Sequence, residues 1–202
     1  MDNDSFRSIQ SIGRNRLIKE LSEQVSVKNE GVIKGIGDDA AVLDETQTYA
    51  GLLSSESFLE GVNFDLTYTP LHHLGYKVVT AGVSDIYAMN GKPDSVLVNL
   101  SLPNKLSADM VNEIYKGINA AAVDYQVEIA GGDLNASHQI LSISVTAHGR
   151  IEKEKILFRS GAKIGDAICV TGDLGGAIAG LRILMREKNT GRNISKISFS
   201  LI

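Results

Sequence analysis

The sequence predicts an α+β (mixed α/β) fold in which a mixed sheet and helices form a domain over residues 1–150. Stretches with apolar residues at helical spacing intermix with alternating, strand-like stretches, and short turns often join neighbouring strands. Of the 202 residues, 43% are hydrophobic, which is enough for a proper core. The 20 glycines against 3 prolines are typical of many turns rather than of disorder.

The apolar spacing and the capping residues predict where helices lie. The expected helices cover residues 6–25 (two short helices with a break at Gly13), 69–89 and 107–122. Thr69 is expected to cap the second of these ranges, with Pro70 at the first helical position and Gly91 as the C-terminal cap. Ser107 is expected to cap the third.

Strands are expected between these helices. They cover residues 32–33, 40–43, 48–55, 95–102, 127–130 and 140–146. The strand at 48–55 ends in the polar run Ser54-Ser55-Glu56-Ser57, and the strand at 127–130 runs into Gly131-Gly132-Asp133. Polar side chains therefore gather at the ends of expected strands, where they can line a site.

Charge and cysteine content exclude several classes of protein. The net charge is −4 and no long Lys/Arg cluster occurs, which argues against a partner that is duplex nucleic acid or an anionic membrane. No apolar run approaches the roughly 18 residues of a membrane helix, and the acidic start is unlike a signal peptide. The single cysteine, Cys169, fits a reducing compartment, and we expect a cytoplasmic protein.

The most informative stretch is an acidic turn that contains Asp38 and Asp39 between glycines and a small apolar run. Adjacent residues of an extended backbone point in opposite directions, so one of the two carboxylates faces a given ligand. Carboxylates near glycines suit hard, oxygen-coordinated cations such as Mg²⁺. A plain acidic turn is the alternative, and the stretch by itself leaves both open.

A second acid, Asp85, lies near the end of the apolar stripe of the helix expected over residues 69–89. The segment after Lys77 is otherwise nearly free of charge. Asp85 is therefore either a solvated helix acid or a group that faces a polar cavity or ion.

The character of the sequence changes after Arg150. A charged link precedes an expected strand at 167–171, and a glycine turn at 172–176 then opens an expected helix that continues to Leu184. This order is typical of a phosphate-binding helix N-terminus, although the lysine and spacing of a P-loop are absent. We expect residues 151–202 to be a linker and the beginning of a truncated second domain.

Several motifs together resemble those of the thiamine-monophosphate kinase family, within the aminoimidazole ribonucleotide synthetase-like superfamily. In order along the chain they are Gly35-Ile36-Gly37-Asp38-Asp39-Ala40-Ala41, Leu59-Glu60-Gly61-Val62, Ser84-Asp85-Ile86-Tyr87-Ala88-Met89, Gly131-Gly132-Asp133, Arg159-Ser160-Gly161-Ala162-Lys163 and Val170-Thr171-Gly172-Asp173-Leu174-Gly175. The resemblance implies the first domain of a two-domain fold with helices on one face of a mixed sheet. It also implies ATP- and Mg²⁺-dependent, in-line phosphorylation of thiamine monophosphate to thiamine diphosphate by a homodimer.

The resemblance also implies roles for particular residues. Metal-site positions are Asp39, Ser54, Ser55, Glu56, Asp85 and Asp133; ATP contacts are Gly132, Asp133 and Arg159; and Asn63 stands at a position associated with the thiamine substrate. No catalytic acid or base is implied, because a phosphate acceptor is largely ionised at neutral pH. What the protein must supply is neutralised charge and an aligned acceptor oxygen.

The chain departs from the family pattern at two positions. Glutamate stands at Glu56 where the family usually has aspartate, and asparagine stands at Asn63 where it usually has histidine. A non-catalytic nucleotide-binding or dimerisation module, or another ATP-dependent enzyme of the superfamily, therefore remains an alternative.

Overall fold

The computed structural model describes residues 7–189. Its elements are α1 (Ile9–Ile12), α2 (Arg14–Ser22), β1 (Val32–Lys34), β2 (Ala41–Asp44), β3 (Tyr49–Leu59), α3 (Leu71–Ala88), β4 (Lys92–Pro103), α4 (Ala108–Tyr125), β5 (Glu128–Ser137), β6 (Ser142–Glu152), a 3-10 turn at Lys153–Lys155, and α5 (Gly176–Asn189). The strands form one six-stranded sheet in the order β1-β2-β3-β6-β4-β5. The expected mixed α/β fold is confirmed.

The sheet is mixed because one pair of neighbouring strands is parallel. β4 and β5 run parallel, and α4 is the crossover between them, whereas the other neighbouring pairs are antiparallel. The long strands β3 and β6 pair over their whole length from Tyr49–Glu152 to Leu59–Ser142. β2 pairs with β3 only from Ala50 to Leu53, so β2 does not cover the edge of β3 beyond Leu53.

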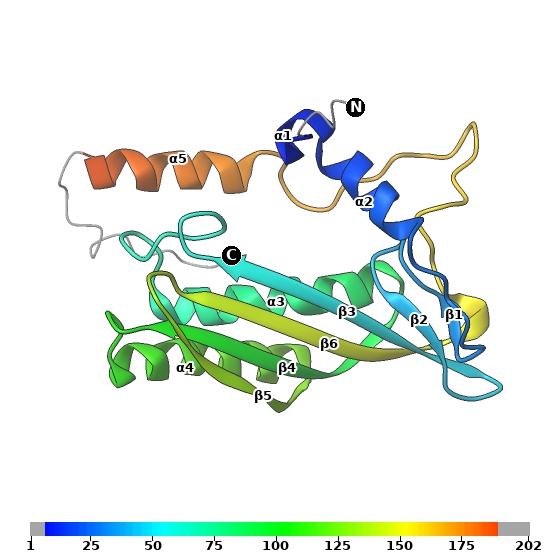
Figure 1. The fold of residues 1–202 in the computed structure, drawn as a ribbon, viewed down its shortest axis with the longest axis horizontal. Helices are drawn as coiled ribbons and strands as arrows, with labels where there is room; N and C mark the ends of the chain where they lie inside the picture. The colour runs from blue at the N-terminus through cyan, green and yellow to red at the C-terminus, as the bar shows by residue number, and fades with distance from the viewer. Residues whose placement is uncertain (1–6, 190–202) are drawn as a thin grey trace, which may run out of the picture.

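The helices α3 and α4 pack together on one face of the sheet (Figure 1). Two glycines bring them into close contact. A Cβ atom at Gly75 would lie 1.9 Å from the Ile114 carbonyl oxygen, and one at Gly117 would lie 1.8 Å from the His72 carbonyl oxygen. Glycine is therefore required at both positions, and the core fills the space between this helix pair and the sheet.

The opposite face of the sheet carries small polar side chains. Ser57 and Ser144 hydrogen bond across β3 and β6 at 3.2 Å, and Ser55 and Thr146 do so at 3.4 Å. Leu53, on the same face, is 40% exposed. Figure 1 shows α1, α2 and α5 in a separate row above β3, so these helices leave this polar face uncovered.

The predicted ends of the long helix α3 were wrong in detail. Pro70, in an extended conformation, is the N-cap, and no side chain caps the helix, because Thr69 closes a turn on the Asp65 carbonyl instead. At the other end Asn90, not Gly91, has the left-handed conformation, with φ 65°. A Cβ atom at Gly91 would lie 2.4 Å from Leu52, so that glycine is needed for packing. The predicted Ser107 cap of α4 is confirmed.

Several predicted strands differ from the structure. β3 continues past Ser55 to Leu59, so the polar run that was expected at its end lies within the strand, and β6 continues past Thr146 to Glu152. β5 continues past Ala130 to Ser137, because Gly131 and Gly132 adopt positive φ angles that let β5 pass close to β4. A Cβ atom at Gly132 would lie 1.8 Å from the Val98 carbonyl oxygen. Residues 167–171 form no strand, since no neighbouring strand pairs with them. The helix that follows is confirmed as α5, but it extends to Asn189.

Most apolar side chains of α5 are exposed. Ile178 and Ile183 are 52% and 57% accessible to solvent, unlike the buried apolar stripe of α3. Between residues 7 and 189, no helix has both the length and the apolar composition needed to cross a membrane.

Candidate metal and nucleotide site

The acidic turn lies between β1 and β2, beside the C-terminal end of α3. Ala40, which follows the two aspartates, is buried, and its backbone N–H donates to the Sδ atom of Met89 at 3.2 Å. Met89 itself is fully buried at the end of α3. The turn is thus held against the helix that carries Asp85.

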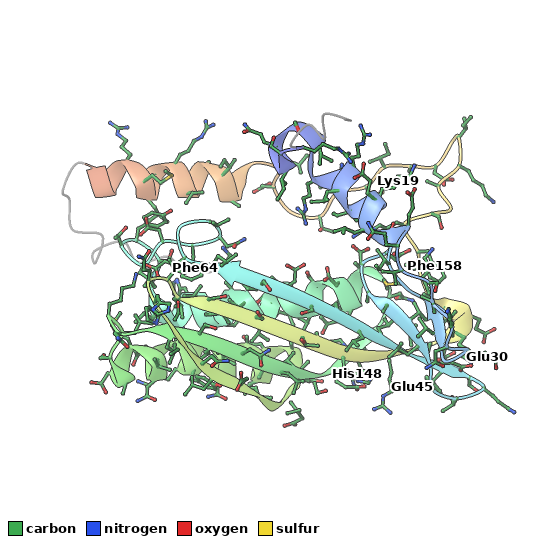
Figure 2. All side chains as sticks on the ribbon, viewed as in Figure 1. Lys19, Glu30, Glu45, Phe64, His148 and Phe158 are labelled. Carbon is green, nitrogen blue, oxygen red and sulfur yellow. The ribbon has the colours of Figure 1, made fainter. Side chains whose placement is uncertain are left out.

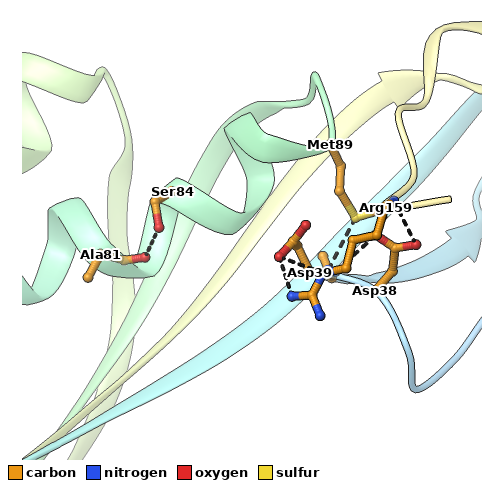
Figure 3. Close-up of polar contacts among 7 residues, drawn as sticks. Asp38, Asp39, Ala81, Ser84, Met89 and Arg159 are labelled. Atoms are coloured by element: carbon orange, nitrogen blue, oxygen red, sulfur yellow. Dashed lines mark hydrogen bonds and ion pairs between the residues drawn. The ribbon is translucent and has the colours of Figure 1, made fainter. Parts of the chain in front are cut away.

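The two aspartates of the turn have different partners, as their adjacent positions predict. The carboxylate of Asp38 accepts the backbone N–H of Asp39 at 3.1 Å and that of Arg159 at 3.3 Å. The carboxylate of Asp39 accepts two N–H groups of the Arg159 guanidinium, from Nε at 3.1 Å and from Nη2. Figure 3 shows Arg159 folded over both aspartates. The Asp38 carboxylate therefore binds backbone N–H groups, whereas the Asp39 carboxylate binds the charged side chain of Arg159.

Asp85 is half-buried on α3 and lies within electrostatic reach of this turn. Burial is the first cause that raises the pKa of its carboxyl group, and the charges of Glu56 and Asp39 raise it further. The Arg159 guanidinium opposes this rise. Three carboxylates and one cation therefore face a common region.

The run from Ser54 to Glu56 divides between the two faces of the sheet. The hydroxyl of Ser54 is buried and donates to the Gly82 carbonyl oxygen of α3 at 3.2 Å. The alternation of β3 places the half-buried Glu56 on the same side, toward α3. Ser55 points to the uncovered face, where its hydroxyl meets Thr146. Of these three residues, Ser54 and Glu56 share the face of Asp85.

Asp133 and Gly132 lie on the edge strand β5, away from this region. The sheet register joins Ser57 to Ser144, Ser144 to Asn99 and Asn99 to Asp133, so Asp133 belongs to the uncovered face. Three strand spacings separate its strand from β3, about 14 Å. Its carboxylate accepts the side-chain amide of Asn135 at 3.1 Å. A single chain thus does not bring Asp133 together with Asp39 and Asp85.

Asn63 stabilises the loop that follows β3. Its side-chain oxygen accepts the Leu59 backbone N–H at 2.9 Å, and its carbonyl oxygen accepts the Lys77 ammonium at 2.8 Å. Nearby Glu60 pairs with Lys105 at 2.5 Å. The side-chain oxygen of Asn63 therefore already has a partner within the loop.

The chemistry of the donor set suits a divalent cation. Carboxylate oxygens, as in Asp39, Glu56 and Asp85, are the ligands that Mg²⁺ prefers. Among the described residues, no three His, Cys, Asp or Glu side chains converge closely enough to hold a metal ion. Asp39 and Glu56 are near enough to Asp85 to influence its carboxyl group electrostatically, but the three carboxylates do not form a closed set of metal ligands.

Two contributors to the geometry of the site were not among the predicted site residues. Asp38 joins the acidic turn to the backbone of residue 159, and Met89 accepts a hydrogen bond from the turn. The paired aspartates gave a signal for Asp38, because one of two adjacent side chains must point away from a ligand. A thioether acceptor such as Met89 has no sequence pattern, and only the tertiary structure reveals it.

This combination of fold and acidic turn defines a class of protein. The family model of the AIR synthase related protein, N-terminal domain, matches residues 37–151, which is more than half of the chain. The match begins at the acidic turn and ends in β6. The chain belongs to this family.

Thiamine-monophosphate kinases are among the proteins that this chain is similar to. The kinase of Bacillus subtilis is 35% identical over 164 residues, covering 81% of this chain and 50% of the relative, and that of Rhodopirellula baltica is 42% identical over 160 residues, covering 74% and 49%. The solved structure of AaThiL complexed with AMPPCP and TMP superposes with a TM-score of 0.80 at 32% identity, covering 91% of this chain and 56% of that one. The chain spans about half the length of the curated relatives that it matches.

Proposed function

We propose that this chain is the N-terminal part of a thiamine-monophosphate kinase, which transfers the terminal phosphoryl group of ATP to thiamine monophosphate and forms thiamine diphosphate. The observation that carries the proposal is the likeness to the kinase AaThiL in complex with AMPPCP and TMP, over 91% of this chain. The AMPPCP in that complex suggests ATP as the phosphoryl donor, and the TMP suggests thiamine monophosphate as the acceptor. We propose a direct transfer in which a phosphate oxygen of thiamine monophosphate attacks the terminal phosphorus of ATP in line with the departing ADP.

The residues of the acidic region have the chemistry for this reaction. In our proposal Asp39, Glu56 and Asp85, with the hydroxyl group of Ser54, hold Mg²⁺ directly or through water. The metal role expected for Ser55 is not part of this group, because its hydroxyl lies on the opposite face of the sheet, beside Thr146. Bound Mg²⁺ would neutralise phosphate charge during the transfer. The long, positively charged side chain of Arg159 lies beside these acids, and we propose that it binds a phosphate of ATP.

The roles that we propose for Asp133 and Gly132 depend on a homodimer. Both lie on the strand β5, and Asp133 belongs to the polar sheet face that α3 and α4 leave uncovered. We propose that two chains pair through this face, which places the metal- and ATP-binding roles of Asp133 and Gly132 near the subunit interface. One chain by itself does not unite these acids, because Asp133 lies on the face of the sheet opposite to Glu56.

The remaining assignments concern the substrate and the domains. We propose that Asn63 acts on the thiamine side of the site by shaping the loop after β3, because its side-chain oxygen already binds Leu59. Residues 1–150 form the ATP-binding, metal-binding and dimerisation domain, and residues 151–202 form a linker and the beginning of the second domain. A cytoplasmic location is part of the same proposal.

The test is a Mg²⁺-dependent assay of the intact gene product with ATP and thiamine monophosphate. Asp39→Asn and Asp133→Asn should each lower turnover by about 100-fold or more, because each removes a charge that holds the cation. Glu154→Gln, which removes an exposed acid from the 3-10 turn, is the matched control and should leave turnover unchanged. Nucleotide binding without turnover by the folded, unmodified protein would instead indicate a binding module or another acceptor.

A further inference from the structure

Arg159 holds the segment after β6 onto the acidic turn. Its guanidinium binds the Asp39 carboxylate, and its backbone N–H binds the Asp38 carboxylate. The side chain of Arg159 is 62% exposed and that of Asp39 is 24% exposed. The ion pair is therefore partly exposed, and solvent and small ions reach it.

The same segment is attached to the end of α3 just before Arg159. The Leu157 backbone N–H donates to the Met89 carbonyl oxygen at 3.2 Å, and the Asn90 side-chain amide donates to the Lys155 carbonyl oxygen at 3.1 Å. After Arg159, residues 160–175 are exposed. Arg159 thus marks the point at which the chain leaves the first domain.

Arg159 also supplies the positive charge of the acidic region. Its pKa is raised above the usual value for arginine, first by the hydrogen bonds to Asp39 and then by the charges of Asp39, Asp38 and Asp85. The same guanidinium favours the ionised form of Asp85 against burial and against the charges of Glu56 and Asp39. Without a bound cation, Arg159 is the counter-charge for this group of acids.

We infer that Arg159 is a latch that a divalent cation opens: Mg²⁺ and the Arg159 guanidinium compete for the Asp39 carboxylate. When Mg²⁺ takes the carboxylate, the guanidinium is released, and the acidic turn then holds the segment after β6 only through the backbone hydrogen bond from Arg159 to Asp38, which loosens this segment. The released guanidinium is then available to a nucleotide phosphate. This inference rests on the proposed function in one respect, the assignment of Asp39 to the metal.

The competition follows from the geometry of one oxygen atom. Both guanidinium N–H groups converge on Oδ1 of Asp39. A carboxylate oxygen that coordinates Mg²⁺ gives up its lone-pair direction to the ion, and two cations at one oxygen repel each other. Binding of the cation and binding of the guanidinium therefore oppose each other, and each weakens the other by the same factor.

The single cysteine of the chain gives a direct readout. Cys169 is exposed and lies ten positions beyond Arg159 in the segment that opening of the latch would loosen. A nitroxide label on Cys169 reports the mobility of this segment by electron paramagnetic resonance. The titrant is MgCl₂ alone, with NaCl at matched ionic strength as the control, and calorimetry measures Mg²⁺ affinity in parallel.

In the unmodified chain, Mg²⁺ should increase the mobility of the label. In Arg159→Gln, the label should be mobile before Mg²⁺ is added, and Mg²⁺ should bind about two- to fivefold more tightly, the range expected for loss of an exposed ion-pair competitor. Arg159→Lys keeps the charge but not the two convergent N–H groups, so it should also mobilise the label. Arg150→Gln, which breaks the Arg150–Asp94 pair on β6 and β4, is the matched control and should behave as the unmodified chain does.

A label that Mg²⁺ does not mobilise in the unmodified chain would overturn the latch, whether or not the ion binds. An Arg159→Gln variant with unchanged mobility and unchanged Mg²⁺ affinity would overturn it as well. The kinase assay gives a separate result. Turnover together with an unresponsive label would contradict the latch and support the kinase function. A responsive label without turnover would support the latch and contradict the kinase function.

Discussion

The backbone N–H of Ala40 donates a hydrogen bond to the Sδ atom of Met89 at 3.2 Å, across 49 positions of sequence. Both residues are buried, with exposures of 4% and 0%. This contact fixes the start of β2 against the end of α3. It therefore sets the distance between the turn that carries Asp39 and the helix that carries Asp85.

Met89→Leu tests the contribution of this contact to stability. Leucine keeps the side-chain volume but leaves the buried Ala40 N–H without its acceptor, so we expect a loss of about 1–2 kcal/mol in the free energy of unfolding. Urea denaturation measures it. Leu100→Met, a volume-conserving change at another fully buried position, is the control and should cost less. Equal losses in the two variants would mean that the thioether contact adds nothing beyond packing.

Gly75→Ala tests the close packing of α3 on α4. The new methyl group would meet the Ile114 carbonyl oxygen at 1.9 Å, so the helices must separate, and we expect a loss of about 2–3 kcal/mol in the free energy of unfolding. Gly180→Ala, on the exposed helix α5, meets no atom within 4 Å and should be neutral or slightly stabilising. Thermal denaturation measures the stability of both variants. A Gly75→Ala protein with the same unfolding temperature as the unmodified protein would contradict this account.

Local patterns were sufficient to predict much of the fold. Alternation identified the strands that became β4 and β6, an apolar run identified the start of β3, and Ser107 marked the start of α4. The extent of β5 was not predictable from local pattern, since glycine is unfavourable inside a strand and the expected strand therefore ended before Gly131 and Gly132. Their place in a strand depends on close approach to Val98, a contact made through tertiary structure.

The resemblance named candidate residues for the site but not their arrangement in space. The resemblance named Asp39, Asp85 and Asp133 together, and the structure places the third on another strand and another face of the sheet. Likewise, Ser54 and Ser55 are neighbours in sequence but point to opposite faces. Sequence order carries no information about which face meets which helix until the register of the sheet is known.

Asp85→Asn tests the electrostatic strain at the acidic region. Burial and the charges of Glu56 and Asp39 raise the pKa of Asp85 in the folded state above 3.8, the ordinary value for an aspartate carboxyl group. The folded protein therefore binds a proton more readily than the unfolded chain. Stability contributed by this group is therefore lost as the pH rises from 3.8 through the raised pKa. The asparagine variant should be more stable than the unmodified protein at pH 7, and this advantage should shrink as the pH is lowered.

Urea denaturation between pH 3.5 and pH 7.5, without divalent cations, measures this difference. Asp109→Asn, at an exposed position in the first turn of α4, is the control and should give no such gain at pH 7. A destabilised Asp85→Asn protein at pH 7 would show that the carboxylate makes a net favourable interaction in the folded chain.

Ser57→Arg tests the proposed pairing of two chains through the uncovered sheet face. Ser57 is exposed on this face and bonds only to a neighbouring strand, Ser144 on β6, so the substitution leaves the core intact. An arginine there would bring two like charges and two long side chains into a self-complementary interface. We therefore expect the dissociation constant of the dimer to rise at least tenfold, about 1.4 kcal/mol. Asn112→Arg, on the exposed side of α4, is the matched control and should leave the assembly unchanged. Light scattering after size-exclusion chromatography measures the mass of each variant, and a Ser57→Arg protein that remains as dimeric as the control would place the interface elsewhere.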